Sequence, residues 1–138
     1  MIYICDKMNG GKVMRELKIR KWYKNDECEE YIMAYINLRD MKNCENIDLS
    51  NGVTMQYTGY NDINNKEIFE DDIVRTKSGS LGVIKYGQYS SVNIDGNEHI
   101  GFYIKWIDNT LLRVDLGYWL DKIEVAGNMH ENNINMIR

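Results

Sequence analysis

Four carboxylates stand close together between residues 67 and 72, and their chemistry is the first that this sequence offers. A pair of carboxylates can act as general acid and base, or it can bind a divalent cation. On a strand, Glu70 and Asp72 would lie on one side, whereas the neighbours Asp71 and Asp72 would point to opposite faces. A cation site usually needs more oxygen ligands at tight loop spacing. We therefore expect a solvated turn here rather than a metal or catalytic site.

The other reactive side chains form no catalytic or metal-binding pattern. His99 and His130 are far apart in the sequence, and neither has a cysteine at the spacing of zinc ligands. The serines lie in turn-like contexts without a nucleophile-elbow motif. The Gly-Gly-Lys at residues 10–12 is not followed by Ser or Thr, so it does not match a phosphate loop. The sequence predicts no catalytic residue, no metal site and no cofactor, and therefore no enzyme.

Basic residues gather in segment 15–24, which holds five of them and one acidic residue. Such a run can bind phosphate groups, but it more often forms the solvated face of a strand. We expect the solvated face and keep phosphate binding as the alternative. The basic residues are Arg15, Lys18, Arg20, Lys21 and Lys24.

Aromatic residues are spread through the second half of the chain. Exposed, they could stack bases or anchor a peptide, whereas filling a small core is the simpler expectation. Residues 70–128 contain six basic and nine acidic residues, a balance that suits a protein partner better than a nucleic acid. The candidate binding surface combines Tyr103, Trp106 and Trp119 with the basic residues Arg15, Lys18, Arg20 and Lys21.

Composition indicates a soluble globular protein. The chain has 138 residues, 43% of them hydrophobic, and a formal net charge of −4, which opposes binding to a phosphate backbone. It has no apolar run long enough to cross a membrane and no signal peptide pattern at its beginning. Its three cysteines form no CxxC pair, as in a reducing compartment. We expect a protein of the cytoplasm with no membrane partner.

In the first half of the chain, alternating apolar residues predict strands at 15–22, ended by Trp22 and Tyr23, and at 53–58, ended by Gly59. Residues 28–38 fit either a helix or a strand, and we favour a strand followed by a loop. Residues 61–66 read as an exposed turn, after which residues 68–69 return to the core.

The second half of the chain reads as short strands separated by turn residues, an organisation typical of a small barrel or sandwich. A single helical turn at 117–121 precedes the last strand. The expected strands are 72–76, 81–86, 91–94, 99–107, 111–116 and 122–128.

The first thirteen residues differ in character from the rest of the chain. Gly10 and Gly11 precede Met14 at a distance that resembles a ribosome-binding site before a start codon. Our hypothesis is that Met14 is the natural first residue and that residues 1–13 are an upstream extension. The alternative is an edge strand with a Gly-Gly turn after it.

Three segments together resemble the YopX family of small phage and prophage proteins. They are MRELKIRKW at 14–22, MQYTGYNDINNKEIFEDDIV at 55–74 and EVAGNMHEN at 124–132. The resemblance implies one mainly β domain over 14–138, with an SH3-like barrel at about 70–128, additional N-terminal strands and little helix. It also implies an origin in a phage or prophage and self-association. It implies no established activity and no catalytic residues.

Two departures from the family concern backbone geometry. The family usually has Gly at Asn65 and at Asp71, and Asn and Asp tolerate left-handed backbone better than other residues do, so we expect both turns to be kept. We interpret residues 55–74 as the junction between the N-terminal strands and the barrel. The junction residues are Gln56, Tyr57, Thr58, Gly59, Asp62 and Asp72.

The function expected from these observations is binding without catalysis. The partner would be another protein or a second copy of the chain. The alternative is nucleic-acid binding through the basic segment and the aromatic residues, which the acidic net charge disfavours.

Overall fold

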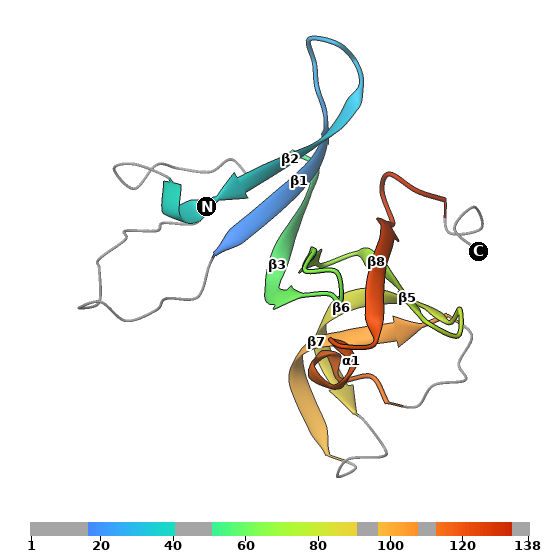
Figure 1. Cartoon of the computed structure of the whole chain (residues 1–138). Coiled ribbons are helices and arrows are strands. Elements are labelled where there is room, and N and C mark those ends of the chain that lie inside the picture. The colour runs from blue at the N-terminus through green and yellow to red at the C-terminus, as the bar shows by residue number, and fades with distance from the viewer. Residues whose placement is uncertain (1–16, 41–50, 91–96, 108–112, 134–138) are drawn as a thin grey trace. The chain divides into compact units, whose positions relative to one another are not determined.

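Strands make up almost all of the regular structure, as Figure 1 shows. The computed structural model describes residues 17–40, 51–90, 97–107 and 113–133. The chain divides into two compact units, unit 1 (Met1–Gly59) and unit 2 (Tyr60–Arg138). The mainly β prediction with little helix is confirmed.

Unit 1 is built on an antiparallel hairpin. Strand β1 (Lys18–Lys24) pairs with β2 (Tyr31–Asn37), after which comes a short 3-10 helix (Leu38–Asp40). The other side of β1 pairs with β3 (Val53–Asn61), and with β4 (Glu67–Phe69) the sheet has the order β2-β1-β3-β4. The preference for a strand within 28–38 is confirmed.

Two predicted strand ends are wrong. Strand β1 continues through Trp22 and Tyr23, because both are good strand formers and pair across the sheet with Met33 and Ile32. Strand β3 continues past Gly59, which has a φ of 87° that glycine adopts without a steric penalty. The boundary between the two units therefore falls inside β3.

Unit 2 contains a second antiparallel sheet with the strand order β7-β6-β5-β8. The predicted strand 72–76 and the short helical turn are confirmed, and strand 81–86 is extended. Among the described strands, β7 and β8 are the edges of this sheet. The SH3-like barrel stays a prediction. The elements are β4 (Glu67–Phe69), β5 (Asp72–Thr76), β6 (Leu81–Ser90), β7 (Glu98–Trp106), α1 (Leu116–Trp119) and β8 (Ile123–Asn128).

The predicted strand at 111–116 is wrong for its described part. Asp115 makes only an isolated bridge to Tyr103, and Leu116 begins α1. Leu116 is 2% exposed, so the segment turns into a helix that buries this residue instead of continuing as a strand. The predicted strand 91–94 and the N-terminal segment 1–13 lie outside the described residues.

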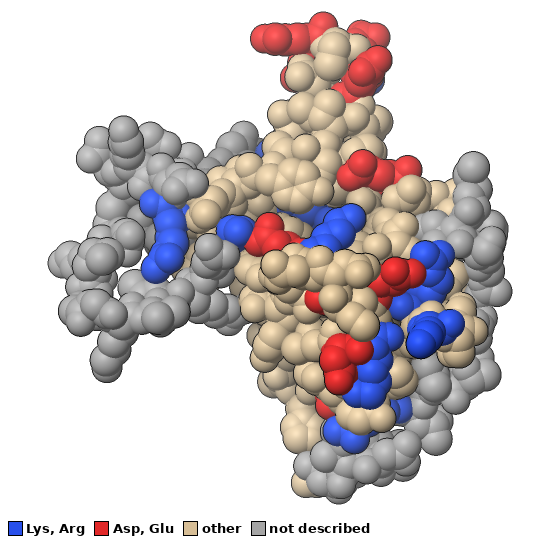
Figure 2. Space-filling model, viewed as in Figure 1, with Lys and Arg blue, Asp and Glu red and all other residues tan. Residues whose placement is uncertain are grey.

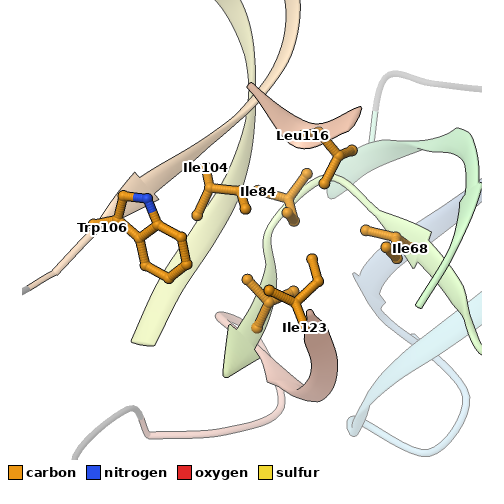
Figure 3. Close-up of a cluster of buried hydrophobic side chains, with 7 residues drawn as sticks. Ile68, Ile84, Ile104, Trp106, Leu116 and Ile123 are labelled. Atoms are coloured by element: carbon orange, nitrogen blue, oxygen red, sulfur yellow. The ribbon is translucent and has the colours of Figure 1, made fainter. Parts of the chain in front are cut away.

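The core of unit 2 is formed by residues from its strands and from α1. Figure 3 shows these side chains gathered in one cluster. Burying each Ile side chain contributes about 1.5–3 kcal/mol relative to leaving it in water, so the cluster is the main source of stability for the sheet. Its members are Ile68, Val74, Ile84, Ile104, Trp106, Leu116 and Ile123.

Gly82 allows β6 and β7 to pack closely above this core. A Cβ atom at this position would lie 2.4 Å from Cγ2 of Ile104 and 2.9 Å from the ring of Trp106. Those distances are shorter than any ordinary van der Waals contact. The absence of a side chain at residue 82 is therefore required for Ile104 and Trp106 to occupy their observed positions.

Candidate interaction surfaces

The predicted junction residues of β3 do not form a common exposed surface. Gln56 is exposed, whereas Tyr57 and Thr58 are 6% and 2% exposed. This difference follows partly from strand alternation, which sends neighbouring side chains to opposite faces. These residues therefore offer no ready site for a ligand.

Asp62 organises the turn after β3. One of its carboxylate oxygens accepts the backbone N–H groups of Asn64 and Lys66, both at 2.8 Å. The other oxygen accepts the backbone N–H of Val125 in β8 at 2.7 Å. The prediction of an exposed turn is wrong at this position, since Asp62 is only 7% exposed. Its hydrogen bonds make it an anchor that joins the turn to β8.

Asp72 performs a similar task between β4 and β5. It is 1% exposed, and its Oδ2 accepts the backbone N–H of Phe69 at 2.7 Å. The prediction of a solvated carboxylate is therefore wrong here. Asn65 and Asp71 have φ values of 63° and 65°, so both replace glycine in left-handed backbone, as predicted.

Asp71 holds a small charged cluster that the sequence analysis missed. Its carboxylate lies 2.8 Å from Nζ of Lys85 and 2.9 Å from Nε2 of His130. Burial by itself would raise the pKa of Asp71, but the hydrogen bonds and charges of Lys85 and His130 outweigh burial and lower it. The backbone carbonyl of Asp71 also accepts the N–H of Met129 at 2.9 Å. The cluster fastens the turn after β8 to the turn before β5.

Metal binding finds no support in the described part of the chain. No three His, Cys, Asp or Glu residues there are placed to hold an ion. The spacing of 59 residues between Asp71 and His130 explains why no local motif revealed their contact.

The basic residues of β1 are divided between the two faces of the sheet. Lys18 and Arg20 lie on one face and Lys21 on the other, because side chains alternate along a strand. Arg20 is 3% exposed, and its Nε donates to the Sδ of Met55 at 3.4 Å. Arg15 lies outside the described residues. The basic strand therefore does not present its cations as one stripe.

Trp106 and Trp119 pack against each other rather than forming a stacking platform. Their ring centroids are 5.0 Å apart, with the planes at 70°. Both indole N–H groups donate to the backbone carbonyl of Arg113, at 3.0 and 2.9 Å. The candidate surface is wrong for Trp106, which is 6% exposed, because the core cluster needs its large apolar side chain. Tyr103 is half-buried.

The hairpin of β6 and β7 exposes an apolar face that the sequence analysis did not single out. Tyr86 pairs with Phe102, and Gln88 pairs with Ile100, so these four side chains share one face. Tyr86 is 56% exposed and Ile100 is 77% exposed. We call these four residues the hairpin face. On the opposite face, Tyr89 stacks on Tyr103 at 5.5 Å.

Unit 2 also contains a basic cleft of about 390 Å³. It lies beside the turn between β5 and β6 and the beginning of β8. Three cationic side chains and one carboxylate line it, together with two isoleucines. The lining residues are Ile63, Arg75, Thr76, Lys77, Gly79, Lys122, Ile123 and Glu124.

The turn between β1 and β2 carries the opposite charge. Figure 2 shows red acidic side chains gathered at the end of this hairpin and blue basic side chains, mixed with some acidic ones, over unit 2. These acidic residues are exposed, and no basic residue lies among them. We call this segment the acidic tip. Its carboxylates are Asp26, Glu27, Glu29 and Glu30.

Comparisons with known proteins support the resemblance seen in the sequence. A family model described as YopX protein matches residues 7–135, nearly the whole chain. No curated protein matches the chain closely enough to count as a relative. Among the described residues, no helix has the length and apolar character needed to cross a membrane.

Proposed function

The chain belongs to the YopX family, and from this premise we propose that it is a non-enzymatic binding or assembly module. In this proposal it is an accessory protein of a phage or prophage and acts in the host cytoplasm. Its partner is another protein or a second copy of itself, so the chain is a homo-oligomer or part of a protein complex. It uses no cofactor.

The observation that carries the proposal is the hairpin face. It exposes Tyr86 and Ile100 on one face, at diagonal positions of a strand pair whose outer member, β7, is an edge of the sheet. Burying an isoleucine or an aromatic side chain contributes about 1.5–3 kcal/mol, and an exposed apolar group on an edge strand is suited to contact with another protein. The four side chains carry no charge themselves, and at one end of the face Gln88 donates a hydrogen bond to the carboxylate of Glu98.

The whole-molecule charge favours a protein partner over a nucleic acid. The net charge of −4 repels phosphate groups at long range. The described basic residues of β1 lie on two faces, and one of them is buried. A protein partner can instead be held by apolar contacts, with few constraints on net charge.

The first experiment measures assembly and its dependence on the hairpin face. Size-exclusion chromatography with light scattering gives the molar mass of the wild-type chain across a range of concentrations. A pull-down from host lysate tests for another partner. We expect assembly or capture by the wild type, and a loss of about tenfold or more for Ile100→Asp, since one lost apolar contact of this size is worth more than about 1.4 kcal/mol.

A matched control uses an exposed side chain in unit 1. Tyr35 is 62% exposed on β2, and Tyr35→Asp should keep the wild-type behaviour. Circular dichroism checks that both variants are folded. A wild-type chain that stays monomeric and captures nothing would contradict the proposal. Binding to DNA that weakens steeply with added salt would support the nucleic-acid alternative instead.

A further inference from the structure

We propose that the basic cleft of unit 2 binds the acidic tip of a second copy of this chain. The inference rests on the proposed function, because it names the partner and the contact through which copies would assemble. It is based on charge complementarity between two described surfaces that the hairpin face does not include.

Lys77 is the cation of the cleft that is available to a partner. Arg75 is paired with Glu124 at 2.8 Å, and Lys122 is paired with Asp121 at 2.7 Å. Among the described residues, no such carboxylate lies beside Lys77, which is exposed. An incoming carboxylate would therefore meet the ammonium group of Lys77, with two further cations close by.

The cleft also has an apolar part, which favours a protein segment over a free anion. Ile63 is 61% exposed at its edge, whereas Ile123 is 1% exposed and belongs to the core cluster, so Ile63 supplies the apolar surface for a partner. A partner that carries both carboxylates and an apolar side chain would use the two parts together. The acidic tip has this composition, because the exposed Tyr31 comes directly after Glu30.

The backbone around the cleft is held by a tight turn between β5 and β6. The N–H of Gly79 donates to the carbonyl of Thr76 at 2.9 Å, and the N–H of Ser80 donates to Oγ1 of Thr76 at 3.0 Å. Gly79 has a φ of 94°, and a Cβ atom there would meet nothing within 4 Å. The turn thus holds the backbone next to the exposed Lys77, with open space beside Gly79.

The backbone of the acidic tip is also held by hydrogen bonds. The N–H of Asn25 donates to the carbonyl of Glu30 at 2.7 Å, and the N–H of Glu27 donates to Oδ1 of Asn25 at 2.9 Å. Glu29 has a φ of 57°, which completes the turn. Because both surfaces are already shaped before contact, their association loses little conformational entropy.

The two surfaces are different, so the contact between copies is heterologous. Each copy offers one acidic tip and one cleft, and repeated tip-to-cleft contacts give a closed ring or an open chain. Contacts between exposed charges weaken with salt, since the Debye length falls from about 10 Å at 0.1 M to about 3 Å at 1 M ionic strength. The assembly should therefore dissociate at high salt.

The test uses two variants, one that reverses the charge of Lys77 in the cleft and one that reverses the charge of the acidic tip. The cleft variant is Lys77→Glu. The tip variant is Asp26→Lys with Glu27→Lys and Glu30→Lys, and Glu29 is left unchanged because of its backbone conformation. Either variant alone brings like charges together at Lys77 or its replacement, and we expect its self-association to be about tenfold weaker or more than that of the wild type. A mixture of equal amounts should assemble again, because each variant then meets a surface of opposite charge.

Lys105→Glu is the control, since Lys105 is exposed in unit 2 and lies outside the cleft. It makes the same change in net charge and should assemble like the wild type. Circular dichroism confirms that all variants are folded. The inference is overturned if the mixture stays dissociated, if Lys105→Glu has the same effect as Lys77→Glu, or if neither reversal changes assembly. If Ile100→Asp abolishes assembly while both reversals leave it unchanged, the proposed function stands and this contact does not.

Discussion

Asp71 affects stability in two opposite ways: its left-handed backbone costs free energy, and the contacts of its carboxylate stabilise the fold. Its left-handed backbone, with a φ of 65°, costs an alanine about 1–2 kcal/mol, costs Asn and Asp less, and costs glycine nothing. Its carboxylate meanwhile binds Lys85 and His130. Three variants resolve the two effects: Asp71→Asn keeps the backbone tolerance, Asp71→Gly removes the strain together with the side chain, and Asp71→Ala removes the contacts while adding strain.

The sizes of the two effects predict the order of stability. The contact with Lys85 is half-exposed, with side chains 41% and 19% exposed, and we count it at about 0.5 kcal/mol. The contact with His130 is more buried, at 19% for each side chain, and we count it at about 1 kcal/mol. Losing both contacts costs about 1.5 kcal/mol, so we expect losses of about 1.5 kcal/mol for Asn and Gly and about 2.5–3.5 kcal/mol for Ala, which adds the strain.

Urea unfolding monitored by circular dichroism measures these differences at neutral pH. Since folding lowers the pKa of Asp71, its carboxylate stabilises the fold fully above its ordinary pKa of 3.8, and the contribution is lost as the pH falls through the lowered folded value. The gap between wild type and Asp71→Asn should therefore close in acid. Equal stability of the Ala and Gly variants would refute the strain argument, and an Asn variant equal to the wild type would refute the contribution of the contacts.

Two further substitutions test the anchors of unit 2. Asp62→Ala should lower the free energy of unfolding by about 2–3 kcal/mol, because the N–H of Val125 and two turn N–H groups lose their acceptor. The control Asp121→Ala, at a side chain 80% exposed, should leave the free energy of unfolding unchanged in the same urea titration. Gly82→Ala should lower the midpoint of thermal unfolding and reduce the free energy of unfolding by about 1–3 kcal/mol, because the added methyl overlaps Ile104. The control is Gly117→Ala, where a Cβ atom meets nothing within 4 Å, and it should not destabilise the fold.

Local patterns were sufficient to predict the strands of unit 2 that alternate or are bounded by turn residues. The strand at 72–76 was placed correctly because glycine-containing turn residues and a run of β-branched side chains agree there. Gly59 misled the prediction because a glycine can either end a strand or let it continue with a positive φ. Residues 111–116 misled it because the requirement to bury Leu116 in α1 outweighs their strand propensity.

The surfaces were harder to predict than the strands. Whether Trp106 fills the core or faces solvent depends on its partners in distant segments, and its neighbour Trp119 approaches it only in the folded chain. The same holds for Asp71, whose partner His130 is 59 residues away. The sequence analysis did not single out the acidic residues at 26–30, and the cleft requires β5 and β8 to pair before its residues meet.

The backbone carbonyl of Arg113 links the fluorescence of two tryptophans. Because it accepts hydrogen bonds from both Trp106 and Trp119, any motion that withdraws it changes the surroundings of two indoles at once. The remaining tryptophan of the chain, Trp22, stacks on Tyr31 in unit 1 at 5.6 Å between ring centroids. The emission of Trp22 therefore reports on unit 1, and the paired emission of Trp106 and Trp119 reports on unit 2. Replacing Trp22 with Phe would leave a chain whose fluorescence tracks the opening of unit 2 alone.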